Sequence, residues 1–332
     1  MQKYLGVDLG GTHLSAAIVN TETGAVTGLH TIPTLAREGH AAVVARMAEL
    51  IEAVITESGL TKGQFSAIGI GVPGMLDLER GLVLFLPNLP GNWPDVPLQA
   101  MIADRLGLPT HLLNDARSMT LGEWAFGAGR GVETMACFTI GTGIGGGLVI
   151  GGKLHLGIGG SGGELGHQII DMHGPPCGCG GRGCLEVFAS GSAITAMGLK
   201  AVTQGLTTCI GEMVDYDLNR INPEVISRAA RAGDEIACDI YERAGFYLGI
   251  AVSNVLTAVG PRKVVIGGGV AQAGDLLFDP IRRTVQERVH IMPKEEVQIL
   301  PAQLGTTAGL IGAALWAHQQ SAASVQSVPK IR

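Results

Sequence analysis

Short runs of apolar residues, separated by polar and glycine-rich turns, open the chain and predict strands at 4–7, 14–19 and 26–32. Residues 41–55 then repeat apolar side chains at helical spacing, and the apolar run 67–72 predicts a buried strand. A mixture of strands and helices in this order predicts an α/β unit, in which helices cover a central sheet.

The same alternation continues to residue 318. It predicts helices at 97–106, 116–126, 192–204, 222–231, 234–259, within 276–289 and at 307–318, and strands at 110–113, 134–140, 148–150, 263–266 and 297–300. A strand, a glycine turn carrying threonine and a second strand occur twice, around 10–12 and around 141–147, which indicates an internal duplication. The tail 319–332 is rich in Ser, Ala and Gln, and we expect it to be mobile.

Composition narrows the class of protein. The chain has 332 residues, of which 46% are hydrophobic and 16% charged, so two compact domains are expected. A net charge of -6 without a basic patch argues against nucleic acid as a partner. No apolar run has the length of a membrane span, and no signal peptide precedes the first predicted strand. We therefore expect a cytoplasmic enzyme that acts on small molecules.

The first glycine turn has the residues of a phosphate site. Asp8 ends a predicted strand, and Gly10, Gly11 and Thr12 follow it. Such glycines let backbone N–H groups face phosphate oxygens, the threonine adds a hydroxyl donor, and Asp8 suits Mg2+ held through water. No Gly-Lys-Ser/Thr follows, and a strand rather than a helix comes next, so this is neither a P-loop nor a dinucleotide fingerprint. By itself, an ordinary hairpin turn explains the motif equally well.

The second glycine turn repeats this logic. It contains Gly141, Thr142, Gly143, Gly145 and Gly146. Two phosphate-holding turns in one chain are far more specific than either turn alone. We therefore expect both turns to contact the phosphates of one nucleotide.

Two further junctions carry candidate chemistry. Gly267, Gly268 and Gly269 follow a predicted strand, and glycine there lets a flat ligand such as adenine pass. Asn114 and Asp115 lie between a predicted strand and a predicted helix, where α/β sheets place chemistry. A helix cap is the alternative role for Asp115.

A cluster of cysteines is the sharpest motif. His167, Cys177, Cys179 and Cys184 have the spacing His-x9-Cys-x-Cys-x4-Cys, which suits a closed, structural zinc site. Free cysteines or a disulfide are the alternatives, and a reducing cytosol disfavours the disulfide. Two carboxylates, Glu164 and Glu186, lie at the edges of this loop, where they are positioned to read a polyhydroxylated ligand. Each alone would otherwise be an ordinary surface charge.

These motifs together resemble the ROK family of sugar kinases and repressors, within the hexokinase–actin–Hsp70 superfamily. The matching stretches are VDLGGTHLSAAIV, GVPGMLD, PNLPGNW, LLNDARSMTLGE, GTGIGGGLVIGGKL, GGELGH, CGCGGRGCLE and VVIGGGV. The resemblance implies an α/β fold of two actin-like, ribonuclease H-like domains, each with a βββαβα core, around a central cleft. It implies a smaller domain at 1–113, completed by a helix at about 305–318, and a larger domain at 114–304.

The resemblance also implies a mechanism. Asp115 would be the general base that takes a proton from the sugar's 6-hydroxyl. ATP and Mg2+ would be bound by the two glycine turns, Asp8 and the 267–269 segment, and the Cys/His set would hold structural Zn2+. The residues expected to contact the sugar are Gly74, Asn88, Asn114, Asp115, Glu164, His167 and Glu186.

The leading interpretation is an ATP-dependent glucokinase that assembles as a homodimer or homotetramer. Kinases of N-acetylmannosamine, N-acetylglucosamine, mannose or fructose are the nearest alternatives. A catalytically silent sugar sensor would lose the base or a phosphate turn, whereas Asp115, Thr12 and Thr142 are present. The Cys/His loop argues against an actin-like nucleotide switch, and the start of the chain at the first glycine turn disfavours the DNA-binding branch. His13 and Arg117 depart from the usual family pattern, and their effect on nucleotide or sugar preference is left open.

Overall fold

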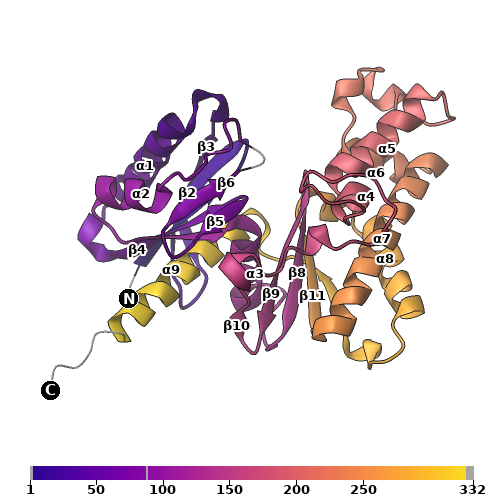
Figure 1. The fold of residues 1–332 in the computed structure, drawn as a ribbon. Coiled ribbons are helices and arrows are strands. Elements are labelled where there is room, and N and C mark those ends of the chain that lie inside the picture. The colour runs from indigo at the N-terminus through magenta and orange to yellow at the C-terminus, as the bar shows by residue number, and fades with distance from the viewer. Residues whose placement is uncertain (1–2, 87–88, 327–332) are drawn as a thin grey trace. The chain divides into compact units, whose positions relative to one another are not determined.

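The computed structural model describes residues 3–86 and 89–326 (Figure 1). The chain divides into two compact units: residues 1–131, 153–163 and 303–332 form the first, and residues 132–152 and 164–302 form the second. The expected domain boundaries at 113/114 and 304/305 stay a prediction. In the described part of the chain, no helix is both long and apolar enough to span a membrane. Asn88, an expected sugar contact, lies outside the described residues.

The first unit is built on a mixed sheet whose strand order is β3-β2-β1-β4-β7. Neighbouring strands are antiparallel up to β1, and β1, β4 and β7 run parallel. The elements are β1 (Lys3–Leu9), β2 (His13–Val19), β3 (Val26–Pro33), α1 (His40–Glu57), β4 (Phe65–Val72), β5 (Met75–Asp77), β6 (Leu82–Phe85), α2 (Leu98–Leu106), β7 (Thr110–Asn114), α3 (Asp115–Phe126), β10 (Lys153–Leu154) and α9 (Ala308–Gln326).

The C-terminal helix α9 completes this unit from the far end of the chain (Figure 1, yellow). Gly6 and Gly69 are register partners on β1 and β4. A Cβ atom at Gly6 would collide with the carbonyl of Leu310, and one at Gly69 with that of Ala313. The two glycines therefore let α9 lie directly against the sheet, at the cost of backbone entropy that glycine loses on folding. Side chains that point to the other face, such as Leu5, pack into the core that includes α1.

The second unit repeats this plan with strands in the order β9-β8-β11-β12. β8 and β9 are antiparallel, whereas β8, β11 and β12 run parallel, as β2-β1-β4-β7 do in the first unit. This repetition agrees with the expected duplication. The elements are β8 (Met135–Ile140), β9 (Ile144–Ile150), α4 (Glu186–Ala189), α5 (Gly191–Thr203), α6 (Pro223–Arg231), α7 (Glu235–Val259), β11 (Lys263–Gly267), α8 (Asp275–Arg288) and β12 (Gln298–Pro301).

Two sequence predictions are wrong in detail. Gly145 and Gly146 were expected in the second turn, but they belong to β9, which begins at Ile144. A Cβ atom at Gly146 would lie 2.9 Å from the side chain of Leu165, so glycine here permits close packing rather than a bend. The last helix was expected to end at residue 318, yet α9 continues to Gln326. Alanine and glutamine are good helix formers, which explains the extension.

Candidate functional site

The junction between β7 and α3 holds the expected base. Asn114 is the N-cap of α3, and its Oδ1 accepts hydrogen bonds from the N–H groups of Ala116 at 3.1 Å and Arg117 at 3.3 Å. Its Nδ2 donates to the carbonyl of Gly74 at 3.2 Å. Asp115 is the first helical residue, and its Oδ1 accepts from the Ala116 N–H at 2.8 Å. One asparagine therefore joins the start of α3 to the Gly74 backbone and fixes where Asp115 begins the helix.

Arg117, two residues further along α3, is only 2% exposed. Its Nε donates to the carbonyl of Gly162 at 2.8 Å. Gly162 closes a glycine-rich loop of the first unit, because its own N–H donates to the Leu156 carbonyl at 2.6 Å. The residue that departs from the family pattern thus attaches the helix of the base to the loop that precedes Glu164 in sequence.

Asp8 lies near the end of β1, and its carboxyl has an unusual environment. Burial, and secondly the negative charge of Asp115, raise the pKa of Asp8 from 3.8 to about 7. A Cβ atom at Gly71 would lie 3.4 Å from both Asp8 Oδ1 and Ser118 Oγ. Within the described residues, the buried Ser118 Oγ has no hydrogen-bond partner. Two carboxylates and an unpaired hydroxyl form a polar site that fits a hydrated divalent cation, because the cation's charge would offset their repulsion.

The first glycine turn links β1 to β2 at residues 10–12. Gly10 N–H donates to the His13 carbonyl at 2.9 Å, and Thr34 Oγ1 donates to the Gly10 carbonyl at 2.7 Å. Thr34 N–H also donates to the Thr12 carbonyl at 2.9 Å. The turn is thus closed by its own backbone and held from one side by Thr34.

The second glycine turn, residues 141–143, borders a pocket of about 570 Å³ in the second unit. Gly191 N–H donates to the Gly141 carbonyl at 2.8 Å, and Ser192 Oγ donates to the Thr142 carbonyl at 2.9 Å. No hydrogen bond among the described residues uses the N–H of Thr142 or Gly143. These N–H groups are suitable donors for a bound anion.

The pocket draws its walls from both predicted and unpredicted residues. Of the expected residues, Gly141, Thr142 and Gly269 line it, whereas Gly143, Gly267 and Gly268 are absent from its described lining. The lining that the sequence reasoning missed is Gly191, Ser192, Thr195, Ala196, Leu199, Asn222, Pro223, Glu224 and Val270. The caps of α5 and α6 were the available signal, because a helix start beside a glycine turn is a frequent ligand site.

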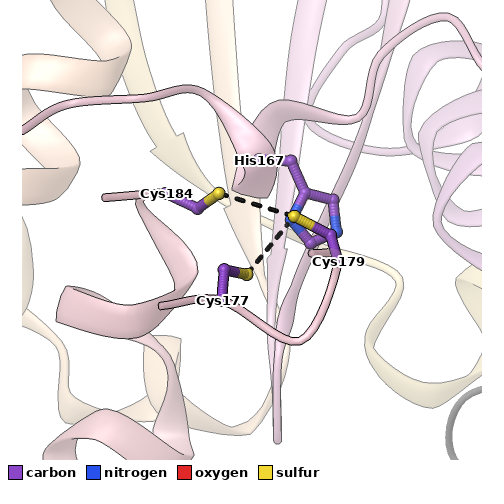
Figure 2. A group of neighbouring side chains, drawn as sticks. All are labelled: His167, Cys177, Cys179 and Cys184. Atoms are coloured by element: carbon purple, nitrogen blue, oxygen red, sulfur yellow. Dashed lines mark hydrogen bonds between the residues drawn. The ribbon is translucent and has the colours of Figure 1, made fainter. Parts of the chain in front are cut away.

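The predicted cysteine and histidine residues converge in the second unit (Figure 2). One ligand atom from each of the four residues, His167, Cys177, Cys179 and Cys184, lies within 4.8 Å of all the others. Cys177 Sγ is 3.7 Å from His167 Nδ1, and Cys179 Sγ is 3.7 Å from Cys184 Sγ. Tetrahedral zinc with bonds of about 2.0–2.3 Å separates its ligand atoms by roughly 3.3–3.8 Å. The set therefore could hold a metal ion, and its donors fit zinc.

The loop that carries this cluster is folded by its own backbone. Cys177 N–H donates to the Gly181 carbonyl at 2.9 Å, and Ile170 N–H donates to that of Gly183 at 2.9 Å. Burial raises the pKa of the Cys177 and Cys184 thiols, whereas the N–H of Gly181 lowers that of Cys179.

The two expected carboxylates flank this loop in different ways. Glu164 is the N-cap of a short 3-10 turn, Leu165–His167, and its carbonyl accepts the His167 N–H at 3.1 Å. Glu186 begins α4, and its Oε2 accepts the N–H of Ile144 at 2.8 Å. Glu186 therefore contacts the end of the second glycine turn, a link that the sequence did not indicate.

Comparison with known proteins places these residues in context. A family model described as ROK family matches residues 4–320. Glucokinases from Thermotoga maritima and Halalkalibacterium halodurans are 38% and 34% identical, over 94% and 96% of this chain and 96% and 95% of their own lengths. A ROK family glucokinase from Streptomyces griseus, solved in complex with glucose and AMPPNP, superimposes with a TM-score of 0.82 at 34% identity. That match covers 96% of this chain and 99% of the other.

Proposed function

The chain belongs to the ROK family, and we propose that it is an ATP-dependent glucokinase that phosphorylates the 6-hydroxyl of glucose. One observation carries the most weight. Over 96% of its length the chain shares its fold with a glucokinase that was solved with glucose and AMPPNP, and Asp115 begins α3 at the β7–α3 junction, which supports its assignment as the general base. Residues on either side of this junction supply the remaining functions.

Asp115 takes the proton from the sugar hydroxyl as the hydroxyl attacks phosphorus. Its Oδ1 accepts the Ala116 N–H, which orients the carboxylate at the start of α3. Asn114 acts mainly by capping α3 and holding Gly74, because its Oδ1 accepts the N–H groups of Ala116 and Arg117 and one Nδ2 hydrogen donates to the Gly74 carbonyl. Its second Nδ2 hydrogen is available for a sugar oxygen. Phosphoryl transfer needs mainly positioning and charge neutralisation, which these groups provide.

ATP occupies the pocket beside the second glycine turn. The adenosine lies near Gly269 and the starts of α5 and α6, and the phosphate oxygens accept hydrogen bonds from the N–H groups of Thr142 and Gly143. Asp8 would hold Mg2+, which would neutralise phosphate charge during transfer.

Zinc held by the Cys/His cluster would have a structural role, because four protein ligands would leave no open position on the ion. His167 can serve both the metal and the sugar. Its Nδ1 faces Cys177, which leaves Nε2 to contact a sugar hydroxyl. Glu164 shares the turn that carries His167 and supplies a carboxylate for the same hydroxyl groups.

A coupled assay with ATP and Mg2+ tests this function. Glucose, mannose, fructose, N-acetylmannosamine and N-acetylglucosamine are compared, and glucose is expected to give the highest kcat/KM. Asp115→Asn should lower kcat by about 10²–10⁴-fold while glucose binding, measured by calorimetry, persists. Asp239→Asn, an exposed aspartate on α7, is the matched control and should keep the parent rate. Parent activity in Asp115→Asn would exclude this residue as the base.

A further inference from the structure

The second glycine turn is attached to a single short segment that follows the Cys/His cluster. Glu186 lies two residues after Cys184, and its Oε2 accepts the Ile144 N–H at 2.8 Å. Gly191 N–H donates to the Gly141 carbonyl at 2.8 Å, and Ser192 N–H donates to that of Thr142 at 3.3 Å. Both ends of the turn are therefore held by residues 186–192.

The segment before the cluster supports the same strand from a second direction. Gly166, next to His167, approaches the Ile144 carbonyl so closely that a Cβ atom there would overlap it. A Cβ atom at Gly146 would lie 2.9 Å from the Cβ and Cγ atoms of Leu165. The chain on either side of the four ligands thus contacts the first residues of β9. Fixing the cluster also fixes the strand that leaves the turn.

A carboxylate at this position needs a physical explanation, because a negative charge close to a phosphate site is repulsive. Glu186 is partly buried, and a Cβ atom at Gly143 would overlap its Oε2. Its Oε2 is committed to a backbone N–H, and such charge-assisted hydrogen bonds are stronger than neutral ones. The geometry of the turn therefore depends on this carboxylate, while the N–H groups of Thr142 and Gly143 are left for a ligand.

We propose that Glu186 is a positioning residue for the nucleotide, which attaches the phosphate-binding turn 141–143 to the Cys/His cluster. This inference rests on the proposed nucleotide role of that turn. It adds to the sugar contact expected of Glu186, because Oε1 lies 3.9 Å from Cys177 Sγ and is not bonded to the turn. Order in the metal loop then affects ATP binding as well as sugar binding.

Nucleotide binding without sugar separates this role from a sugar contact. The affinity for AMPPNP with Mg2+ is measured by calorimetry on the parent, Glu186→Ala and Glu186→Gln. Hydrogen bonds to charged groups correspond to roughly 10- to 100-fold in affinity, so Glu186→Ala should weaken AMPPNP binding by about 10-fold or more. Glu186→Gln keeps an acceptor oxygen without the charge, and it should recover part of the loss.

Glu164→Gln is the matched control, since Glu164 flanks the same loop from the other side of the cluster, at the start of the turn that carries His167. It should change glucose binding and leave AMPPNP affinity as in the parent. Melting temperature and metal content of each variant establish that the fold is retained, and the glutamine variant serves if the alanine variant does not fold. Unchanged AMPPNP affinity in folded Glu186→Ala, or an equal loss in Glu164→Gln, would overturn the inference. If the parent itself does not bind AMPPNP, the proposed kinase function fails, and this inference fails with it.

Discussion

The carboxyl groups of Asp8 and Asp115 repel each other: after burial, the charge of Asp115 is the main cause that raises the pKa of Asp8 to about 7. β1, β4 and β7 are neighbours, and Gly71, opposite Asp8 on β4, has no side chain to separate the two groups. Without a cation, the carboxyl group of Asp8 therefore tends to carry a proton near neutral pH. A divalent cation would release that proton and leave both carboxylates ionised.

This coupling predicts a pH-dependent stability in the absence of Mg2+. The folded-state pKa of Asp8 lies above its unfolded value of 3.8, so folding favours the protonated form. The contribution of Asp8 to stability is complete below about pH 4 and is lost as the pH rises to about 7. Asp8→Asn removes the titration. The melting temperature of Asp8→Asn, relative to that of the parent, should therefore rise as the pH is raised from 5 to 8.

The pH dependence is measured as the difference in melting temperature between Asp8→Asn and the parent, because His111 also makes stability depend on pH. Burial lowers its pKa, so its own contribution to stability increases as the pH rises through about 6.5. It is present in both proteins and cancels. Mg2+ should shrink the difference between Asp8→Asn and the parent at pH 8, because the cation stabilises the ionised carboxylate. A difference that stays constant between pH 5 and 8 would contradict the coupling.

A second buried carboxylate predicts a large stability effect far from the chemistry. Glu123 is fully buried on α3, and its oxygens accept the N–H groups of Ala128 at 2.9 Å, Gln303 at 2.9 Å and Leu304 at 2.7 Å. These donors lie at the ends of the first unit's chain segments, close to residues 131 and 303 where the chain changes units. Glu123→Ala leaves three backbone donors without their acceptor and should lower the free energy of unfolding by about 3 kcal/mol or more.

Urea unfolding measures this change. Glu52→Ala is the control, because Glu52 on α1 pairs with exposed Lys62 at 3.2 Å, and surface ion pairs contribute about 0–1 kcal/mol. If both variants lose the same small free energy, the carboxylate of Glu123 does not hold these segments.

Local signals made much of the fold predictable. The helix α7 runs from Glu235 to Val259 as its pattern indicated, because Asp234 caps its start and Gly260 adopts a left-handed φ of 63° at its end. The start of α6 was similarly marked by Asn222, whose side chain accepts the Val225 N–H. Capping is decided by residues a few positions apart, so a single sequence contains the information.

Long-range contacts account for what the sequence did not predict. In the sequence, Gly6 and Gly69 look like ordinary strand residues. The structure shows that they are needed because α9 packs directly against them. Gly146 read as part of a turn, although its role is to admit the side chain of Leu165. The bond between Glu186 and Ile144 joins residues 42 positions apart, and no periodicity or spacing encodes it. The four metal-ligand candidates were predictable because they lie close in sequence.

Arg117 predicts an effect on the sugar site. Its buried guanidinium holds the Gly162 carbonyl, and Gly162 precedes Glu164 by two residues. Arg117→Asn, which restores the residue usual in the family, should loosen this loop and raise the KM for glucose several-fold. The KM for ATP and the kcat should change less. Steady-state kinetics with each substrate varied in turn provide the measurement.

Arg46→Asn is a suitable control, because Arg46 Nη1 also donates to a carbonyl, that of Thr34, at 2.8 Å. An equal rise in the glucose KM of both variants would mean that any lost guanidinium bond in this unit has the same effect. Arg117→Lys keeps the charge but not the planar donor, so it should behave like the asparagine variant if the bond to Gly162 is what matters.

The Cys/His cluster predicts about one zinc ion per chain. Four ligand atoms lie within 4.8 Å of one another, close enough to bind one ion, and the three cysteines lie on a loop rich in glycine and proline. Ordering such a loop costs about 1–2 kcal/mol per residue fixed, and the metal supplies the compensating bonds.

Metal analysis should find zinc in the parent and a clear loss in Cys179→Ser. Cys238→Ser removes a thiol on α7, outside the cluster, and should keep the metal. Because Glu186 connects this loop to residues 141–144, zinc loss should weaken both sugar and AMPPNP binding. Equal zinc content in Cys179→Ser and Cys238→Ser would show that the cluster does not bind the ion.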